Sequence, residues 1–295
     1  MTTTTPYTTL ITVPQLQALL QNQAANVMVF DCSFELAQPL AGEAQYDEVH
    51  IAGALYANLD KNLSAPHDGT GKVINNASGG RHPLPTREVF ATWLSQIGFR
   101  NDMQAVVYDR NGVNYAGRLW WMLKWAGHDA VAVLDGGLQA WQAAGGAVES
   151  GKPTSHFQSN FELNPPLREL RTANQVQQAL GSAQTVIDAR APARYRGEVE
   201  PLDPVAGHIP GALNRLFSTN IGADGRFKPA AELRAEFDAL LAQRDPATVV
   251  HQCGSGVSAL PNLIAMELAG YAPTALFAGS WSEWCSDASR PVEKG

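Results

Sequence analysis

The sequence repeats itself, and this internal repeat constrains the possible folds more than any other feature. Passages of the first half recur in the same order in the second half: 10–20 with 170–180, 27–33 with 184–190, 50–55 with 208–213, 106–114 with 250–258, and 136–141 with 279–284. The repeat is far longer than the roughly 20–50 residues typical of a solenoid unit. Each copy is therefore predicted to be a domain.

The two copies predict an α/β fold of two tandem domains, each with a mostly parallel sheet flanked by helices. The predicted boundaries are 8–147 for the first domain, 148–166 for a Gly-, Pro- and Ser-rich linker, and 167–290 for the second domain. Within each copy, short apolar runs suited to buried strands alternate with helical patterns, and Thr12 and Thr172 are predicted helix N-caps. Ligands of such sheets bind beyond the carboxyl ends of the strands.

Composition excludes several classes of protein. The net charge is −7 and the sequence has no cluster of Lys and Arg, which argues against a nucleic-acid partner. The sequence holds no run of about 18 apolar residues, which argues against a membrane span. Its Thr-rich start is expected to be a frayed tail and not a secretory signal. Cys32, Cys253 and Cys285 are odd in number and widely spaced, which favours free thiols in a reducing cytoplasm over disulfides or a metal site.

The copies differ where one strand ends. The first reads D-R-N-G-V-N from Asp109, and the second reads C-G-S-G-V-S from Cys253. Gly254 and Gly256 permit backbone conformations closed to other residues, and a helix is expected to follow at once. Backbone N–H groups and the positive helix end would then surround the thiol, which stabilises a thiolate or an anionic sulfur attached to it. The alternative is an inert buried cysteine.

Two reactions commonly use such a loop. Cysteine phosphatases carry an Arg six residues after the cysteine, which clamps the phosphate. In this sequence that position is Ala259, and the loop holds no Arg or Lys, so a phosphate dianion would lack its main countercharge. Sulfur transfer through a persulfide is therefore the favoured chemistry.

The chain resembles the tandem-domain rhodanese family over essentially its whole length. The motifs that carry the resemblance are R-H-P-L-P, L-W-W-M and L-D-G-G-L-x-x-W in the first copy, and R-Y-R-G, G-H-I-P-G-A, C-G-S-G-V-S and G-S-W-S-E-W in the second. The resemblance implies an inactive first domain, with Asp109 in place of the active cysteine. The uncharged loop is similar to the 3-mercaptopyruvate branch, because members that prefer thiosulfate typically carry basic residues there.

The resemblance implies a sulfurtransferase that moves sulfur from 3-mercaptopyruvate through a Cys253 persulfide to cyanide, a small thiol or thioredoxin. It implies no metal and no organic cofactor, and a monomer or weak dimer is expected. The alternatives are a thiosulfate:cyanide sulfurtransferase and a persulfide carrier with little turnover. The loop residues Gly254, Gly256, Val257 and Ser258 are expected to line the substrate site.

The resemblance also suggests residue roles outside the loop. Arg194 matches the Arg that binds the substrate carboxylate, with Arg196 as a competitor for that role. Arg190 is predicted to form a structural ion pair with Asp188. The family often has a second Arg in an E-P-R motif, but this chain has Leu202 at that position.

A proton relay is suggested by the same resemblance, with Ser255, His82 and Asp60 at the matching positions. A histidine that titrates near neutrality could carry the proton of the incoming thiol. The alternative roles are an interface histidine for His82 and a helix cap for Asp60. His50 and His208 occur in both copies, including the copy without the thiol, and are therefore predicted to be structural.

Overall fold

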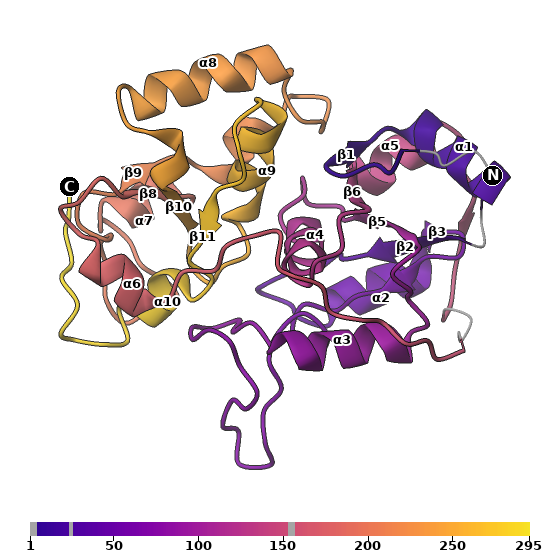
Figure 1. Cartoon of the computed structure of the whole chain (residues 1–295), viewed down its shortest axis with the longest axis horizontal. Helices are drawn as coiled ribbons and strands as arrows, with labels where there is room; N and C mark the ends of the chain where they lie inside the picture. The colour runs from indigo at the N-terminus through magenta and orange to yellow at the C-terminus, as the bar shows by residue number, and fades with distance from the viewer. Residues whose placement is uncertain (1–4, 24–25, 153–156) are drawn as a thin grey trace. The chain divides into compact units, whose positions relative to one another are not determined.

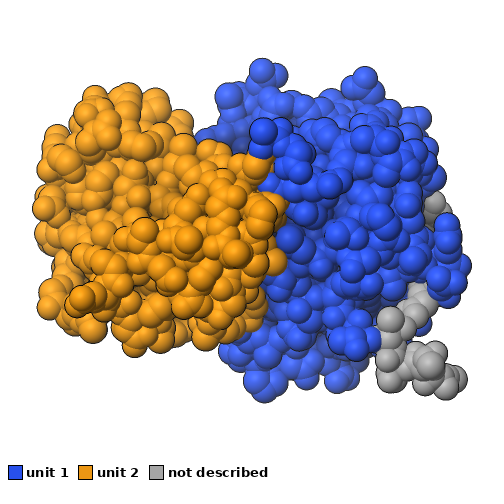
Figure 2. Space-filling model, turned by 90° about the horizontal axis from the view of Figure 1, so that it is seen from above, with its two compact units in different colours: residues 1–63, 86–167, 223–226 blue, residues 64–85, 168–222, 227–295 orange. Residues whose placement is uncertain are grey.

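The computed structural model describes residues 5–23, 26–152 and 157–295 (Figure 1). Residues 1–4 of the Thr-rich start and 153–156 of the predicted linker lie outside this description. The chain forms two compact units, coloured separately in Figure 2. Unit 1 comprises Met1–Leu63, Thr86–Leu167 and Ala223–Arg226, and unit 2 comprises Ser64–Pro85, Arg168–Gly222 and Phe227–Gly295. The units therefore exchange two short segments of sequence.

Unit 1 is built on a parallel sheet in the order β1-β6-β5-β2-β4. Its strands are β1 (Leu10–Ile11), β2 (Val27–Asp31), β4 (Leu55–Tyr56), β5 (Gln104–Tyr108) and β6 (Val131–Leu134), and an antiparallel pair is formed by β3 (His50–Ile51) and β7 (Val148–Glu149). Its helices are α1 (Val13–Gln23), α2 (Ala41–Glu48), α3 (Arg87–Gln96), α4 (Ala116–Trp125) and α5 (Gly137–Ala143). Apolar side chains of α1 and α5 share one core cluster with the sheet.

Unit 2 repeats this plan with the parallel order β11-β10-β8-β9. Its strands are β8 (Thr185–Asp188), β9 (Leu213–Asn214), β10 (Val249–Gln252) and β11 (Ala275–Leu276). Its helices are α6 (Ala173–Gln178), α7 (Pro192–Tyr195), η2 (Phe217–Asn220), α8 (Ala230–Leu241), η3 (Pro246–Thr248), α9 (Leu260–Leu268) and α10 (Ser280–Trp284). The helices α6 and α10 pack on one face of the sheet, and α8 and α9 lie on the other (Figure 1). The predicted α/β fold of two related domains is confirmed.

The repeated histidines are structural, as the sequence predicts. His50 stacks on Tyr46 with ring centroids 3.8 Å apart, and its Nδ1 lies 2.7 Å from the Tyr46 carbonyl oxygen. His208 stacks on Tyr195 at the same 3.8 Å and has the same 2.7 Å contact with the Tyr195 carbonyl oxygen. Both rings are buried. A buried imidazole that stacks on a tyrosine and contacts its carbonyl oxygen holds its turn in place.

Two segments do not pack where the order of the two sequence copies suggests. Residues 64–85 belong to unit 2, where the Gly79 N–H donates to Glu283 and the Arg81 N–H donates to Ser282. In the 148–166 segment, β7 pairs with β3, and buried Phe161 packs on Phe99 with centroids 5.8 Å apart. The described part of that segment therefore packs on unit 1.

Three further features of the helices complete the description of the fold. The helix expected directly after the Cys253 loop begins only at Leu260, so Val257 and Ser258 lie in the loop before α9. Thr172 caps α6 through a capping box with Gln175, as predicted. In the described residues, no helix is long and apolar enough to cross a membrane.

Candidate active site

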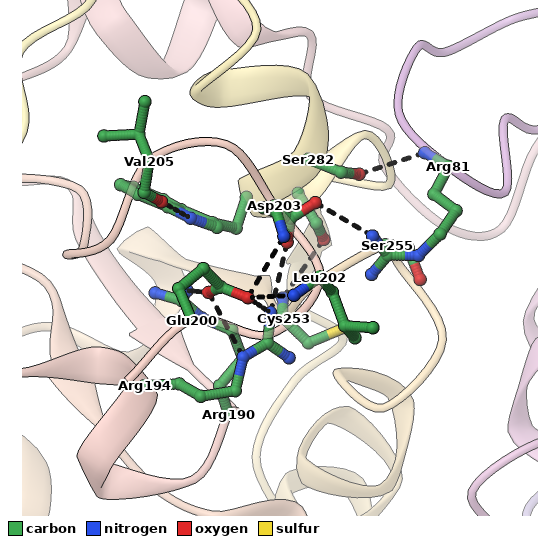
Figure 3. Close-up of polar contacts among 12 residues, drawn as sticks. Arg81, Arg190, Arg194, Glu200, Leu202, Asp203, Val205, Cys253, Ser255 and Ser282 are labelled. Atoms are coloured by element: carbon green, nitrogen blue, oxygen red, sulfur yellow. Dashed lines mark hydrogen bonds and ion pairs between the residues drawn. The ribbon is translucent and has the colours of Figure 1, made fainter. Parts of the chain in front are cut away.

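Cys253 lies directly after β10, where the sheet ends and the loop to α9 begins (Figure 3). Its side chain is buried, and its backbone N–H donates to the Ser280 hydroxyl at 3.1 Å. The carbonyl groups of Cys253 and Gly254 accept from the N–H groups of Trp281 and Ser282 at 3.0 and 2.9 Å. The first turn of α10 therefore fixes the position of the thiol.

The second glycine of the loop is required by geometry. Gly256 has φ of +74°, and a Cβ atom there would lie 2.0 Å from the Ala278 carbonyl oxygen. A side chain would be strained by the left-handed backbone and would also collide with the strand-to-helix connection. The loop can follow this path only with glycine at that position.

The matching loop of unit 1 shows how this kind of backbone holds an anion. The carboxylate of Asp109 accepts four backbone N–H groups at 2.8–3.0 Å, from Asn111, Val113, Tyr115 and Ala116. Burial raises the pKa of this carboxyl group, and the four hydrogen bonds oppose that rise. The loop thus supplies a ring of donors to a side-chain anion at the end of the strand.

The Cys253 loop carries backbone N–H groups at the corresponding positions. Ser255, Val257 and Ala259 match three of the four donors in unit 1. Their backbone N–H groups have no acceptor among the described residues. The two loops are not identical, since Val113 has a positive φ and Val257 does not. An anion carried by Cys253 would nevertheless find several donors close by.

Part of the predicted relay is assembled in unit 2. His82 Nδ1 lies 2.8 Å from the Ser255 hydroxyl oxygen, and both side chains are buried. Asp60 belongs to unit 1, where its backbone N–H donates to Asn58. The contact between Ser255 and His82 agrees with the predicted relay, whereas the role of Asp60 stays a prediction.

The predicted cation Arg194 lies beside the loop. A Cβ atom at Gly254 would lie 3.4 Å from Arg194 Nη1, and Arg194 also pairs with both Glu200 and Asp203. Arg190 forms the predicted ion pair with Asp188 at 2.6 Å. Arg196 instead pairs with Glu198, and both side chains are about half exposed. The structure therefore brings Arg194, and not Arg196, to the loop.

Comparison with known proteins identifies the family to which this chain belongs. The Rhodanese-like domain model matches residues 12–144 and 172–287. The chain belongs to the rhodanese-like domain family. It is 45% identical over 97% of its length to a Pseudomonas aeruginosa protein named "Probable 3-mercaptopyruvate sulfurtransferase", covering 98% of that protein. It is 31% identical to a Gallus gallus "Thiosulfate sulfurtransferase", with coverage of 88% of this chain and 86% of that protein.

A solved structure agrees with this assignment. The crystal structure of SseA from Escherichia coli, described as a 3-mercaptopyruvate sulfotransferase with the rhodanese fold, aligns with a TM-score of 0.75 and 28% identity. The alignment covers 94% of this chain and 100% of that chain. The fold of this rhodanese-like chain is therefore shared, over nearly its whole length, with a relative of known structure.

The sequence did not reveal how the charged groups of this rhodanese-like site contact one another. Arg81 Nη1 and Asp203 Oδ1 form an ion pair at 2.8 Å, and Arg81 Nη2 would lie 3.4 Å from a Cβ atom at Gly254. Glu200, with 3% of its side chain exposed, pairs with Arg194. Arg81 and Asp203 are 122 residues apart, so no local pattern indicates their contact. The signal available in the sequence was the carboxylate of Asp203, which follows Leu202, the position where the family often has an arginine.

The other two cysteines differ from Cys253 in their surroundings. Burial raises the pKa of the Cys32 thiol well above its usual value, and the nearby Asp31 and Asp109 carboxylates add to the rise. Burial also raises the pKa of the Cys285 thiol, and Asp203 contributes. Both thiols therefore remain protonated at neutral pH, as expected for inert cysteines.

Proposed function

We propose that this protein is a sulfurtransferase that carries sulfur as a persulfide on Cys253, with 3-mercaptopyruvate as its donor. The observation that carries the proposal is the pair of matched loops. The terminal oxygen of Asp109 and the outer sulfur of a Cys253 persulfide are each three bonds from Cα and carry negative charge. Four N–H groups hold the Asp109 carboxylate in unit 1, and three of the matching N–H groups in unit 2 have no acceptor in the part of the protein that the structure describes.

The first half-reaction moves sulfur to the protein. The Cys253 thiolate attacks the donor sulfur, the S–C bond breaks, and its electron pair leaves with the carbon as pyruvate enolate. The proton that was on the donor thiol passes to that enolate and yields pyruvate. Ser255 and His82 are in contact and are proposed to carry this proton, with Asp60 as the third member of the predicted relay. The persulfide anion stays among the backbone N–H groups of the loop, lined by Gly254, Gly256, Val257 and Ser258.

The second half-reaction removes the sulfur. The carbon of cyanide or the sulfur of a thiolate attacks the outer persulfide sulfur, the S–S bond breaks, and its electron pair regenerates the Cys253 thiolate. This is a ping-pong scheme with a covalent intermediate. A small thiol or thioredoxin is the proposed physiological class of acceptor. The three free thiols fit a reducing compartment, so the cytoplasm is the proposed location.

Arg194 is the proposed partner of the donor carboxylate, because its guanidinium lies beside the loop at Gly254. Thiosulfate is the alternative donor, favoured by one observation. Leu202 stands where a second Arg would bind the carboxylate of mercaptopyruvate, and its side chain is 46% exposed. Arg196 is left out of the proposed site because it pairs with Glu198 on the surface.

The test compares the two donors at equal concentrations, with cyanide as acceptor and thiocyanate formation as the readout. The expected result is a higher kcat/KM for 3-mercaptopyruvate than for thiosulfate. A clear preference for thiosulfate would overturn the choice of donor. A persulfide without steady-state turnover of either donor would instead identify a carrier protein.

A further inference from the structure

Asp203 occupies a distinctive place in unit 2, because its carboxylate bridges two arginines. Oδ1 lies 2.8 Å from Arg81 Nη1, and Oδ2 lies 3.1 Å from Arg194 Nη2 (Figure 3). Only 4% of the Asp203 side chain is exposed. A carboxylate held between two guanidinium groups has the arrangement expected of a bound carboxylate ligand.

The two arginines lie directly at the proposed reaction centre. A Cβ atom at Gly254 would lie 3.4 Å from Arg81 Nη2 and 3.4 Å from Arg194 Nη1. Gly254 directly follows Cys253, so the pair of cations lies against the loop residue next to the one that carries the thiol. A small anionic donor whose sulfur approaches Cys253 would bring its own negative group to these same cations.

The carboxylates around Arg194 are held in different ways. Glu200 Oε1 accepts the backbone N–H groups of Leu202 and Asp203 in addition to its bond from Arg194, so it shapes its own loop. The Asp203 carboxylate has no partner other than the two arginines among the described residues. A rotation of its side chain would release it without breaking any backbone hydrogen bond. Glu200 is thus built into the loop, whereas Asp203 is replaceable.

We infer that Asp203 is a specificity-determining residue whose carboxylate competes with the donor for Arg81 and Arg194. This inference rests on the proposed function. A donor must displace the carboxylate before its own anionic group can bind. The displaced carboxylate remains nearby and repels a thiosulfate dianion more strongly than a mercaptopyruvate monoanion. Asp203 therefore selects against the more highly charged donor.

The experiment compares Asp203→Asn with a matched control, Glu198→Gln. Glu198 lies in the same segment and also pairs with an arginine, but its side chain is 55% exposed. Both substitutions remove one negative charge and keep the side-chain shape. Two quantities are measured: binding of pyruvate to the unreacted protein by calorimetry, and kcat/KM for each donor. A second variant, Asp203→Ser, removes the carboxylate in another way. Thermal unfolding of every variant shows whether a change in binding comes from loss of competition or from loss of folding.

We expect Asp203→Asn to bind pyruvate about fivefold more tightly, the size of one partly screened charge contact. Its kcat/KM should rise for both donors and more for thiosulfate, while Glu198→Gln stays at the wild-type values. Weaker or unchanged pyruvate binding in folded Asp203→Asn and Asp203→Ser would overturn the inference, because it would make Asp203 a residue that positions the arginines. Pyruvate binding does not require sulfur transfer. If the wild type transfers no sulfur from either donor, the proposed function fails while this binding comparison still decides the inference.

Discussion

At the level of single residues, the contact between Ser255 and His82 is expected to assist one sulfur donor and not the other. The two side chains meet at 2.8 Å although they are 173 positions apart in the sequence. A mercaptopyruvate thiol brings a proton that must be moved, whereas thiosulfate brings none at neutral pH. A relay through these side chains can therefore assist only the first donor.

Ser255→Ala and His82→Asn are each expected to lower kcat with 3-mercaptopyruvate about 10²-fold, a common contribution of a positioned acid or base. The double variant should be no slower than either single variant, because the two residues act in one path. Turnover of thiosulfate should change little in all three. Steady-state kinetics with both donors provide the measurement, and an equal loss with thiosulfate would show that the residues only shape the loop.

Single residues also show how far the sequence predicts this site. The difference between Cys253 and Asp109 and the roles of His50 and His208 could be predicted because the two copies can be compared position by position. The contacts of Asp203 with Arg81 and Arg194 could not, because long side chains meet there from separate loops. Their pairing depends on three-dimensional positions that no spacing in the sequence indicates.

At the level of secondary-structure elements, β10 and the loop after it position the reactive thiol. The strand β10 delivers Cys253, and the first turn of α10 holds the loop through Ser280, Trp281 and Ser282. The sequence predicted the strand and the later helix, but not the residue at which that helix begins. Gly256 adopts a left-handed backbone conformation, so the helix can start only after it, and α9 begins at Leu260.

Gly256→Ala tests this packing, and Gly211→Ala is its matched control. Both glycines have φ of +74°, but a Cβ atom at Gly211 meets nothing within 4 Å. The control should lose only the cost of the left-handed backbone, about 1–2 kcal/mol of unfolding free energy. Gly256→Ala should lose more than the control and should also lose sulfur transfer. Equal losses of unfolding free energy in denaturant titrations would contradict the close contact.

A buried histidine in β10 is expected to make the stability of the protein depend on pH. His251 is fully buried, neither ring nitrogen has a partner among the described residues, and burial lowers its pKa to about 3. Between the unfolded pKa of about 6.5 and that value, the unfolded chain binds the extra proton. Stability is therefore expected to fall as the pH decreases through this window, by about 1.4 kcal/mol per unit from this residue.

His251→Leu is expected to remove this contribution and leave a flatter dependence of unfolding free energy on pH between 6.5 and 4. Chemical denaturation at a series of pH values measures the difference between the two proteins. Identical slopes for the wild type and the variant would show that His251 is protonated or solvated in the folded chain.

The whole chain combines two copies of one plan, of which only one carries the thiol. The two units are not simple halves of the sequence, because residues 64–85 of the first copy belong to unit 2. That segment carries Arg81 and His82, which contact Asp203 and Ser255. The repeat predicted the fold of each copy, but an insertion present in one copy cannot be placed by comparison with the other.

A fragment of residues 167–295 should therefore be defective even though it contains Cys253. It lacks the segment whose Gly79 and Arg81 N–H groups donate to Glu283 and Ser282. We expect it to unfold at a lower temperature than the full chain and to transfer sulfur from 3-mercaptopyruvate at least about 10²-fold more slowly, since it lacks His82. Calorimetry and the cyanide assay measure both properties. Full activity of the fragment would show that unit 2 does not need residues 64–85.

Mass spectrometry of the protein after incubation with 3-mercaptopyruvate determines whether Cys253 carries the transferred sulfur. We expect the addition of one sulfur atom on the peptide that contains Cys253. The addition should be lost in Cys253→Ser and retained in Cys285→Ser, whose thiol is buried and has a raised pKa. Sulfur that persists in Cys253→Ser, or that resides on Cys32 or Cys285 in the wild type, would contradict this expectation.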